Sequence, residues 1–333
     1  MEKQATIKAL AEWLKAHDDF VLIGHVYPDG DAAGSCMGAM LALRALGKRA
    51  FVCLPNKLPR MFAKYPFADE IVTPDQPLPF EPKTAFSLDA SEYPRMGDAC
   101  AIYDRCEAHA MLDHHGTNPG FGEIFHIEGE RIATGELVTE LIGELGVEMT
   151  QDMATWLFIA ISTDSGHFRF GGTAPSTMYA TAKLLEAGVD LGTVSRELWN
   201  TRSKARTHLM GVVLANLEVS ADGRMAWARL TNEMLDRCGA LREDNEGIVN
   251  YLVEIEGVEF AALAEERENG TKFSLRSKLW LDVAEDVARP LGGGGHSRAA
   301  GCSLNLPMEE ALARVLESAR RALDNTETNG MNV

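Results

Sequence analysis

The sequence predicts an α/β protein: an N-terminal domain on a doubly wound, mostly parallel sheet, then a linker helix, then a smaller C-terminal α/β domain. First, apolar segments at 20–26, 49–54, 84–89 and 108–115 alternate with helical patterns, which is typical of a parallel sheet covered by helices. Second, a chain of 333 residues exceeds the size at which one hydrophobic core usually keeps growing. Third, the alternation of strands and helices restarts beyond residue 218.

Helices in the first part of the chain are predicted from the spacing of their apolar residues and from the residues at their ends. Thr134 is expected to be the N-cap of one helix, and Gly188 to end another that Pro175 opens. A long apolar stretch at 151–164 predicts a buried helix. In chain order, the predicted helices lie within 1–20 and at about 32–46, 134–146, 151–164, 175–188 and 191–218.

The C-terminal part repeats the alternation on a smaller scale. Strands are expected in MAWARL, VEFAALAEE and KFSLRSK, followed by a helix in DVAEDVARPLG, a glycine-rich segment and a helix in EEALARVLESARRAL. The expected organisation is an N-terminal domain at 1–190, a linker helix region at 191–218, a C-terminal domain at 219–325 and a disordered tail at 326–333.

The chain is acidic, with 49 Asp and Glu residues against 32 Lys and Arg residues and a formal net charge of −17. Broad basic surfaces usually bind long nucleic acids, so this balance argues against such ligands. Six cysteines without regular spacing, an N-terminus without the features of a signal peptide and the lack of a membrane-spanning apolar run predict a reduced, cytoplasmic protein.

The strongest candidate for chemistry is GHVYPDGDAAGS, at 24–35. His25 follows the first apolar segment, and Asp29 and Asp31 come four and six residues later. Gly30 lies between the carboxylates and can adopt backbone angles that other residues avoid. The simpler alternative is an exposed Pro-Asp-Gly turn. The histidine before this turn and the small residues after it, at 32–35, favour carboxylates that converge on a metal ion.

Further acidic and imidazole side chains follow other apolar segments. Asp89 ends AFSLD, and Asp164 closes the long apolar helix. MLDHHG ends another strand with Asp113, His114 and His115. A single aspartate at a strand end is more often a cap or turn residue than a ligand. Several such ends in one sheet are hard to explain as caps, because so many buried charges require a counter-ion such as a divalent cation.

The donor types narrow the choice of ion. Asp and His ligands without Cys suit Mn²⁺, Fe²⁺, Co²⁺ or Zn²⁺, and imidazole makes an all-oxygen Mg²⁺ site a poorer fit. The candidates outnumber the ligands of a single tetrahedral zinc ion. They suffice for two ions about 3.5–4 Å apart, an arrangement that other enzymes use for displacement at phosphorus.

A glycine-rich motif, PLGGGGHSRAAG at 290–301, lies between a predicted helix and a predicted strand. A flexible linker is one explanation of its glycines. The other is an anion site, in which backbone N–H groups and His296 face a phosphate. Arg276 is a second candidate for this role, because a guanidinium can form paired hydrogen bonds to phosphate. The residues alone leave both explanations open.

Taken in order, GHVYPDGDAAGS, SLDAS, MLDHHG, STDSGHFRF and GGGGHSRAAG resemble the motifs of the DHH phosphoesterase family whose members carry a type 1 DHH-associated domain. The similarity covers nearly the whole chain and is strongest to the branch of bifunctional oligoribonucleases and phosphoadenosine-phosphate phosphatases. It implies a catalytic domain at 1–190, a linker helix at 191–218 and a substrate-binding domain at 219–325 that closes over a central cleft.

The resemblance also implies two Mn²⁺ ions per chain, for which Co²⁺ or Mg²⁺ could substitute. Asp89 would bridge the two ions. One ion would be held by His25, Asp29 and Asp89, and the other by Asp31, Asp89, His114 and Asp164.

The remaining candidates would act on the substrate. Asp113 would orient a neighbouring ligand. His115 would point toward the scissile phosphate, where it could steady developing charge or protonate the leaving oxygen. A terminal phosphate or the nucleotide backbone would be gripped by Arg276, Gly293, Gly294, Gly295 and His296.

Three functions follow as hypotheses. The main one is hydrolysis of short oligoribonucleotides to 5′-mononucleotides, of 3′-phosphoadenosine 5′-phosphate to AMP and phosphate, or of both. The second keeps the chemistry but acts on linear dinucleotides from cyclic-dinucleotide turnover or on longer single strands, against which the acidic charge argues. The third is a non-catalytic nucleotide sensor, which would predict a broken ligand set. Neither long duplexes nor membranes are expected partners, and residues 191–218 could form a hinge or a homodimer contact.

Overall fold

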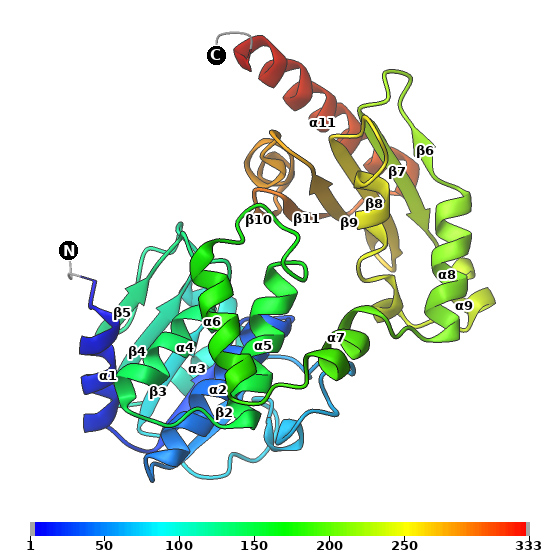
Figure 1. The fold of residues 1–333 in the computed structure, drawn as a ribbon. Helices are drawn as coiled ribbons and strands as arrows, with labels where there is room; N and C mark the ends of the chain where they lie inside the picture. The colour runs from blue at the N-terminus through cyan, green and yellow to red at the C-terminus, as the bar shows by residue number, and fades with distance from the viewer. Residues whose placement is uncertain (1–3, 331–333) are drawn as a thin grey trace. The chain divides into compact units, whose positions relative to one another are not determined.

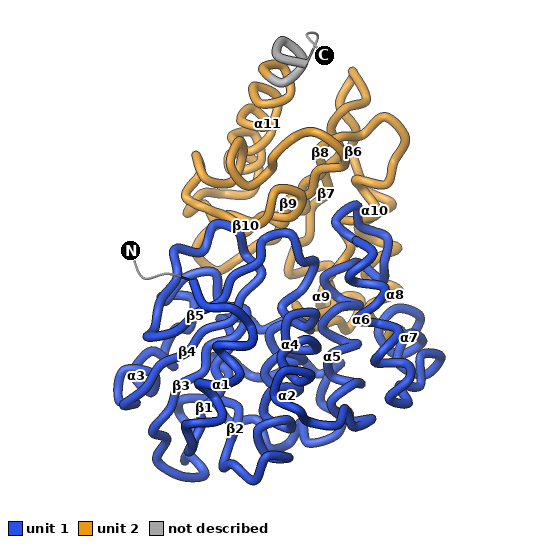
Figure 2. Tube along the Cα trace, turned by 60° about the vertical axis from the view of Figure 1, so that its left-hand side comes forward, with its two compact units in different colours: residues 1–201 blue, residues 202–333 orange. Residues whose placement is uncertain are grey.

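The structure, a computed structural model, describes residues 4–330, and it describes side chains as far as residue 325. It divides into two compact units, residues 1–201 and residues 202–333 (Figure 2). Each unit contains one sheet with its own hydrophobic cores. The α/β fold class predicted from the sequence is therefore confirmed.

The N-terminal unit is built on a sheet of five parallel strands (Figure 1). Its strands are β1 (Phe20–Ile23), β2 (Ala50–Cys53), β3 (Thr84–Leu88), β4 (Ala108–Asp113) and β5 (Ile124–Ile127). Their order in the sheet is β2-β1-β3-β4-β5. The first four coincide with the predicted apolar segments. The edge strand β5 has no counterpart in the prediction, because its residues are mostly half-buried and form no continuous apolar run.

Helices cover both faces of this sheet (Figure 1). Phe20 and Leu22 of β1 enter one hydrophobic core, and Val21 and Ile23 enter the other, since successive side chains of a strand point to opposite faces. Burial on both faces explains why these strands are continuous apolar runs in the sequence. One face is covered by α1 (Ile7–Ala16), α2 (Gly30–Ala45), α4 (Thr134–Leu145) and α5 (Gln151–Asp164), and the other by η2 (Tyr93–Ala99) and α3 (Cys100–Tyr103).

The start of α4 differs from the prediction by one residue. Thr134 is the first residue of the helix, and Ala133 occupies the N-cap position. Thr134 does not cap its own helix because its backbone N–H donates to Asp31 and its hydroxyl donates to Asp89. The polar residue at the helix start therefore serves a tertiary contact.

The last helices of the N-terminal unit lead to the unit boundary. The helix α6 (Pro175–Glu186) is followed by Gly188, whose left-handed backbone (φ 98°) suits glycine. Residues 191–218, expected to form one linker helix region, contain two helices instead. α7 (Leu191–Trp199) belongs to the N-terminal unit and α8 (Lys204–Ala215) to the C-terminal unit.

The C-terminal unit contains a mixed sheet of six strands. They are β6 (Glu218–Val219), β7 (Met225–Leu230), β8 (Phe260–Arg267), β9 (Gly270–Ser277), β10 (Gly294–His296) and β11 (Ala299–Leu304). The order in the sheet is β10-β11-β9-β8-β7-β6. Only the pair formed by β7 and β8 is parallel among the described strands of this sheet.

The faces of this second sheet are also covered by helices. One core contains α8, α9 (Asn232–Cys238) and α10 (Ile248–Val253), and the other contains α11 (Met308–Gly330). The helix expected in DVAEDVARPLG is a π-helical turn, η4 (Val283–Ala288), followed by a 3₁₀ turn, η5 (Arg289–Leu291).

Helix α11 continues through residues 326–330, where a disordered tail is expected from the sequence, and residues 331–333 lie outside the described part. Within the part of the chain that the structure describes, no helix is both long enough and apolar enough to cross a membrane.

Candidate metal centre

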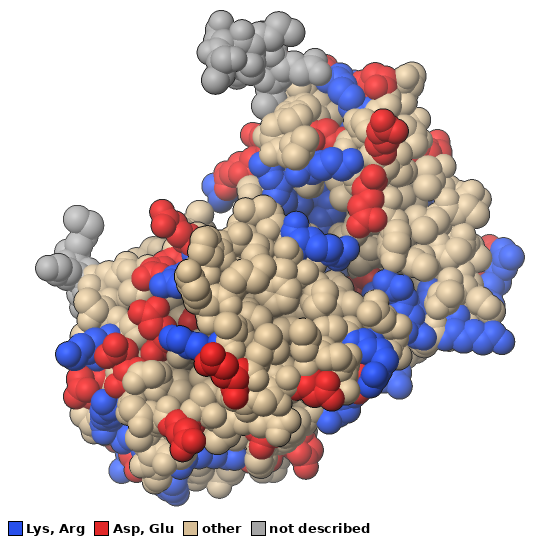
Figure 3. Space-filling view, in the orientation of Figure 1, with Lys and Arg blue, Asp and Glu red and all other residues tan. Residues whose placement is uncertain are grey.

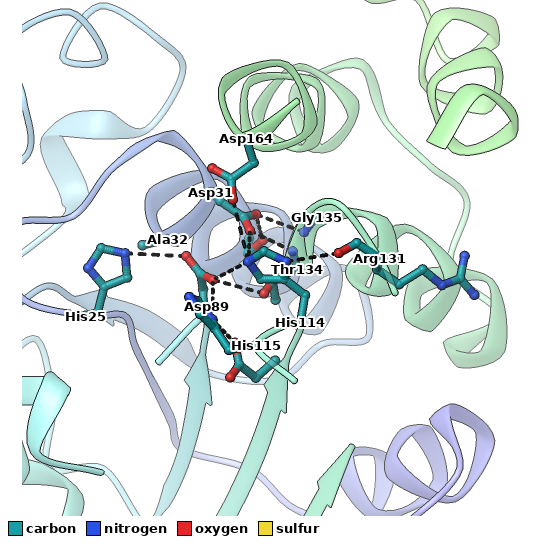
Figure 4. A network of polar contacts seen from close by, with 12 residues as sticks. His25, Asp31, Ala32, Asp89, His114, His115, Arg131, Thr134, Gly135 and Asp164 are labelled. Carbon is teal, nitrogen blue, oxygen red and sulfur yellow. Dashed lines mark hydrogen bonds and ion pairs between the residues drawn. The ribbon is translucent and has the colours of Figure 1, made fainter. Parts of the chain in front are cut away.

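Polar side chains gather at the carboxyl ends of three neighbouring strands (Figure 4). His25 lies two residues beyond the end of β1, Asp89 directly follows β3, and β4 ends at Asp113. His114 and His115 come next in the chain. Because parallel strands end at the same edge of a sheet, residues from three separate segments meet there.

Two helices complete this cluster. Asp29 is the N-cap of α2 and accepts two backbone N–H groups of the first turn, each at 3.0 Å. Asp31 lies in that first turn, and Asp164 is the last residue of α5. The two helices pack closely at Gly34, where a Cβ atom would lie 2.3 Å from the carbonyl oxygen of Trp156. Gly34 therefore allows the packing that brings Asp31 and Asp164 together.

One potential metal-binding group contains His25, Asp29 and Asp89. His25 Nε2 lies 3.7 Å from Asp29 Oδ1 and 3.5 Å from Asp89 Oδ2. The other ring nitrogen, Nδ1, is 2.8 Å from the carbonyl oxygen of Val26. A carbonyl oxygen can only accept a hydrogen bond, so Nδ1 carries a proton and Nε2 is the nitrogen available to a cation.

A second potential group surrounds His114. Its Nε2 atom lies 3.8 Å from Asp31 Oδ2 and 3.5 Å from Asp164 Oδ2. The same nitrogen is 3.5 Å from Asp89 Oδ1, whereas the other oxygen of Asp89 faces His25. Asp89 therefore lies between the two groups and presents one oxygen to each (Figure 4).

His115 and Asp113 form a pair beside these groups. His115 Nδ1 lies 2.8 Å from Asp113 Oδ1 and 3.7 Å from Asp89 Oδ1. Asn118 Nδ2 donates to Asp113 Oδ2 at 2.6 Å and to the carbonyl oxygen of Ala90 at 2.9 Å. The buried Asp113 carboxylate is thus held from two sides and orients the His115 ring.

The start of α4 binds carboxylates of the cluster, a contact that the sequence motifs do not predict. The backbone N–H groups of Thr134 and Gly135 donate to Asp31 at 2.6 and 2.9 Å. The Thr134 hydroxyl donates to Asp89 Oδ1 at 3.1 Å. The positive end of the helix dipole favours carboxylates at this position. Thr134 itself is the sequence signal at this position, and its local pattern predicts only a helix cap.

Arg131 supports the cluster from the loop before α4. Its carbonyl oxygen accepts the Nδ1 proton of His114 at 3.1 Å (Figure 4). Its guanidinium is 3.5 Å from Glu136 Oε2 and 3.1 Å from Glu140 Oε2. The Glu136 side chain is fully buried and accepts the Thr177 hydroxyl at 2.6 Å. These ion pairs hold the loop whose carbonyl orients His114.

Burial and mutual repulsion raise the pKa values of the clustered carboxylates. Burial and the neighbouring Asp29 raise the pKa of Asp31 to about 7, and burial and Asp31 raise the pKa of Asp89 to about 6. Burial also raises the pKa of Asp164 well above its ordinary value. Among the ion pairs of the described residues, those of Asp31, Asp89 and Asp164 involve only histidine. Divalent cations would offset the cost of this buried negative charge.

The chemistry of the donors fits such a cation. Carboxylate oxygens and imidazole nitrogens are ligands that Mn²⁺, Co²⁺ and Zn²⁺ accept. Within each group the ligand atoms lie within 4.8 Å of one another, as the ligands of a shared ion must. The residues present therefore suit the metal ions that the sequence resemblance implies.

The predicted phosphate-binding residues lie in the C-terminal unit. Arg276 of β9 is mostly buried, and its guanidinium donates to Asn250 Oδ1 and to the carbonyl oxygen of Leu275, each at 2.9 Å. Burial lowers the pKa of this guanidinium. The structure thus places Arg276 and the residues at 293–296 in a different unit from the cluster around Asp89.

The glycine-rich motif forms a hairpin with β11. Gly294 and His296 are exposed residues of β10, which pairs antiparallel with β11. A Cβ at Gly293 would lie 2.1 Å from the carbonyl oxygen of Gly301, and a Cβ at Gly295 2.5 Å from that of Ala299. Close approach of two strands therefore explains these two glycines. The flexible-linker explanation is wrong for this segment, and the anion site stays a prediction.

Known proteins resemble this chain over nearly its whole length. The family model described as "DHH family, N-terminal domain" matches residues 19–161, and the model described as "DHHA1 domain" matches residues 238–325. The bifunctional oligoribonuclease and PAP phosphatase NrnA of Thermus thermophilus is 37% identical over 321 residues, which are 95% of this chain and 94% of that protein. The protein of the same name from Bacillus subtilis is 23% identical and covers 89% of this chain and 92% of its own length.

A solved structure shows the same architecture. The exopolyphosphatase-related protein from Bacteroides fragilis superposes with a TM-score of 0.89 at 29% identity, and the match covers 95% of each chain. Sequence and structure therefore agree over both units. This chain belongs to the DHH family and carries a DHHA1 domain in its C-terminal unit.

Proposed function

We propose that the chain is a metal-dependent phosphoesterase that hydrolyses short oligoribonucleotides to 5′-mononucleotides and 3′-phosphoadenosine 5′-phosphate to AMP and phosphate. The printed name of the Thermus thermophilus relative includes both activities. The observation that carries the proposal is the position of Asp89, whose two oxygens lie 3.5 Å from His25 Nε2 and from His114 Nε2. A carboxylate placed in this way supports two adjacent cations.

Two Mn²⁺ ions are the proposed cofactors, with Co²⁺ or Mg²⁺ as substitutes. When bound, such ions polarise a phosphate and activate water. The hydrogen bonds from His25 and His114 Nδ1 to carbonyl oxygens keep each Nε2 directed at its group of carboxylates. One ion would be held by His25, Asp29 and Asp89, and the other by Asp31, Asp89, His114 and Asp164.

His115 is proposed to act on the leaving group. Burial opposes a charge on its ring, but the hydrogen bond to Asp113 and the nearby carboxylates of Asp89, Asp113 and Asp31 together raise the pKa of His115. A ring whose Nδ1 proton is held by Asp113 can give a proton from Nε2 to the leaving oxygen of the nucleotide. Asp113 contributes by fixing the orientation of the His115 ring and by stabilising its protonated form.

Arg276, Gly293, Gly294, Gly295 and His296 are proposed to contact a terminal phosphate or the nucleotide backbone. The hydrogen bonds of Arg276 go to neutral oxygens of Asn250 and Leu275, which supports a role of its charge in binding an anion. The exposed β10 offers backbone N–H groups beside the His296 imidazole.

The surface charge supports small substrates. The formal net charge of −17 argues against a broad basic surface. In the view of Figure 3, Lys and Arg side chains are scattered among Asp and Glu on the N-terminal unit, and a smaller group of them gathers on the C-terminal unit. Because long strands are usually held by basic grooves, dinucleotides and 3′-phosphoadenosine 5′-phosphate fit this protein better.

A product assay with Mn²⁺ tests the proposal. The substrates are a diribonucleotide, an oligoribonucleotide of about five residues, long single-stranded RNA and 3′-phosphoadenosine 5′-phosphate, offered in parallel. We expect 5′-mononucleotides from the short substrates, AMP from the last, and little release from the long strand. Asp89→Ala should lose both bound metal and turnover, and Asp69→Ala, at an exposed position, is the matched control.

Three other outcomes of this assay would contradict the proposal or favour an alternative function. Turnover close to that of the wild type in Asp89→Ala would contradict the two-ion site. Turnover restricted to linear dinucleotides or to long strands would favour the alternative substrates. A metal-loaded protein that binds nucleotides and hydrolyses none of them would favour a nucleotide sensor.

A further inference from the structure

The segment after Asp164 carries aromatic and basic side chains that the proposed catalysis does not use. We propose that His167, Arg169 and Trp199 bind the nucleobase of the nucleotide whose phosphate lies at the metal centre. These three residues are called the base platform below. The inference rests on the proposed function, because it assumes that a nucleotide phosphate binds beside Asp164.

Chain geometry keeps the base platform near the metal centre. His167 is three residues beyond Asp164, and three residues span at most about 11 Å even when fully extended. Asp164 Oδ2 itself lies 3.5 Å from His114 Nε2. A nucleotide held through its phosphate could therefore reach His167 with its base.

The three side chains of the platform form one cluster. The ring centroids of His167 and Trp199 are 5.7 Å apart, and the two ring planes make an angle of 32°. The guanidinium carbon of Arg169 lies 5.7 Å from the centroid of the Trp199 ring. Nucleobases stack on aromatic rings and on guanidinium planes, largely independently of sequence. The cluster thus offers the chemistry that a base requires.

Hydrogen bonds hold the His167 ring in one orientation. Trp199 Nε1 donates to Ser162 Oγ at 3.0 Å, and Ser162 Oγ lies 3.0 Å from His167 Nδ1. An indole N–H can only donate, so Ser162 accepts from Trp199, and its own proton is available for His167 Nδ1. With Nδ1 as the acceptor, the ring carries its proton on Nε2, where it can donate to an acceptor of a base. Burial and the nearby Arg169 lower the pKa of His167, which favours this neutral form.

The backbone of the segment is strained, as is common in ligand-binding loops. Gly166, His167 and Phe168 all have positive φ angles, of 57°, 61° and 64°. Residues other than glycine rarely adopt this conformation. This loop conformation is stabilised by the hydrogen bond from the His167 N–H to the Ser162 carbonyl oxygen at 2.7 Å and by packing of Phe168 near Phe158. A strained position held by several contacts supports a functional constraint on His167.

A structural role of these residues is the main alternative. The same contacts could serve only to brace the C-terminal end of α5 and, with it, Asp164. In that case a substitution would weaken metal binding and all ligands alike. A nucleobase site predicts a loss restricted to ligands that carry a base.

Inhibition by AMP and by ribose 5-phosphate separates these roles, because the two ligands differ only in the base. With a diribonucleotide as substrate, we expect AMP to inhibit the wild type at least about tenfold more strongly, the scale of one stacked base. His167→Ala should move the ratio of the two inhibition constants toward one. Trp199→Phe keeps a ring but loses the donor to Ser162, and should give an intermediate ratio. Tyr179→Ala, at an exposed aromatic residue of α6, is the matched control and should keep the wild-type ratio.

Bound Mn²⁺ is measured in each variant. An unchanged ratio in His167→Ala, or equal weakening of both inhibitors together with loss of metal, would overturn the base platform. If His167→Ala does not fold, an unchanged ratio of the two inhibition constants in Trp199→Phe would also overturn the base platform. If the wild type hydrolyses no nucleotide at all, the proposed function fails, and calorimetric titration with AMP and ribose 5-phosphate still tests the platform.

Discussion

The Asp31 carboxylate accepts the backbone N–H of Gly135 at 2.9 Å, although 104 positions in the sequence separate the two residues. Gly135 lies in the first turn of α4, where backbone N–H groups have no partner within the helix. The bond joins the start of α4 to the start of α2 at the candidate metal centre. A Cβ at position 135 would lie 2.6 Å from the Cβ of Ala160 on α5. This glycine therefore allows α4 and α5 to approach closely beside Asp31.

Gly135→Ala should destabilise the protein by about 1–3 kcal/mol, because the added methyl group overpacks a filled space. It should also weaken metal binding, since α4 must move away from Asp31. Gly143→Ala in the same helix is the matched control, because among the described residues no atom apart from the neighbouring residues and backbone of the helix itself lies within 4 Å of the added Cβ. The control should be neutral or stabilise by about 0.5–1 kcal/mol. Urea denaturation with and without Mn²⁺ measures both effects, and equal results for the two variants would contradict the packing argument.

The metal-free protein should lose stability as the pH rises. Asp31 and Asp89 have pKa values of about 7 and about 6 in the folded protein, against an ordinary value of 3.8. Between about pH 4 and pH 7 the folded state therefore holds protons that the unfolded state has released, so the free energy of unfolding falls as the pH increases. The raised pKa values of His25 and His115 act in the same direction at higher pH.

Thermal denaturation of protein freed of metal by a chelator, at about pH 5.5 and about pH 8, checks this sign. We expect a higher Tm at the lower pH. Asp31→Asn, which is neutral at both values, should show a smaller difference than Asp69→Asn. Mn²⁺ should raise Tm more at the higher pH, because the ligands must be deprotonated. A higher Tm of the metal-free protein at about pH 8 would refute the argument.

Glu136→Gln should weaken metal affinity by about tenfold or more, the usual scale for residues that orient a metal ligand. The variant keeps an acceptor for Thr177 but removes the charge that pairs with Arg131, whose carbonyl orients His114. Glu140→Gln removes a half-exposed carboxylate from the same guanidinium and should cost only about 0–1 kcal/mol of stability. Titration with Mn²⁺ compares the two, and equal affinities would show that Glu136 does not position the site.

His115→Ala should lower kcat on a diribonucleotide by about 10²–10⁴ while Mn²⁺ remains bound, since general acid catalysis usually contributes that much. The loss should be smaller on a p-nitrophenyl ester of a nucleotide, because p-nitrophenolate leaves without needing a proton. The measurement is kcat for both substrates alongside the metal content. Equal losses on the two substrates would indicate that His115 does not protonate the leaving group.

Much of the fold follows from local sequence patterns. The strands β1 to β4 are buried on both faces, so each is a short apolar run whatever its partners are. The edge strand β5 is half-buried and carries no such pattern. The local context of Thr134 predicts a helix cap, whereas its backbone N–H donates to Asp31 and its hydroxyl to Asp89. Local patterns thus determine which segments are buried, and they fail where a residue serves a distant partner.

The sequence by itself determined the positions of the candidate ligands. His25, Asp89 and the run from Asp113 to His115 directly follow apolar segments, and the ends of parallel strands meet at one edge of a sheet. Only the tertiary structure decided that Asp89 faces both His25 and His114, and that α4 and the Arg131 carbonyl support the cluster. Apart from proline, every residue has the same backbone N–H and carbonyl groups, so their role depends on where the fold places them and cannot be predicted from residue type.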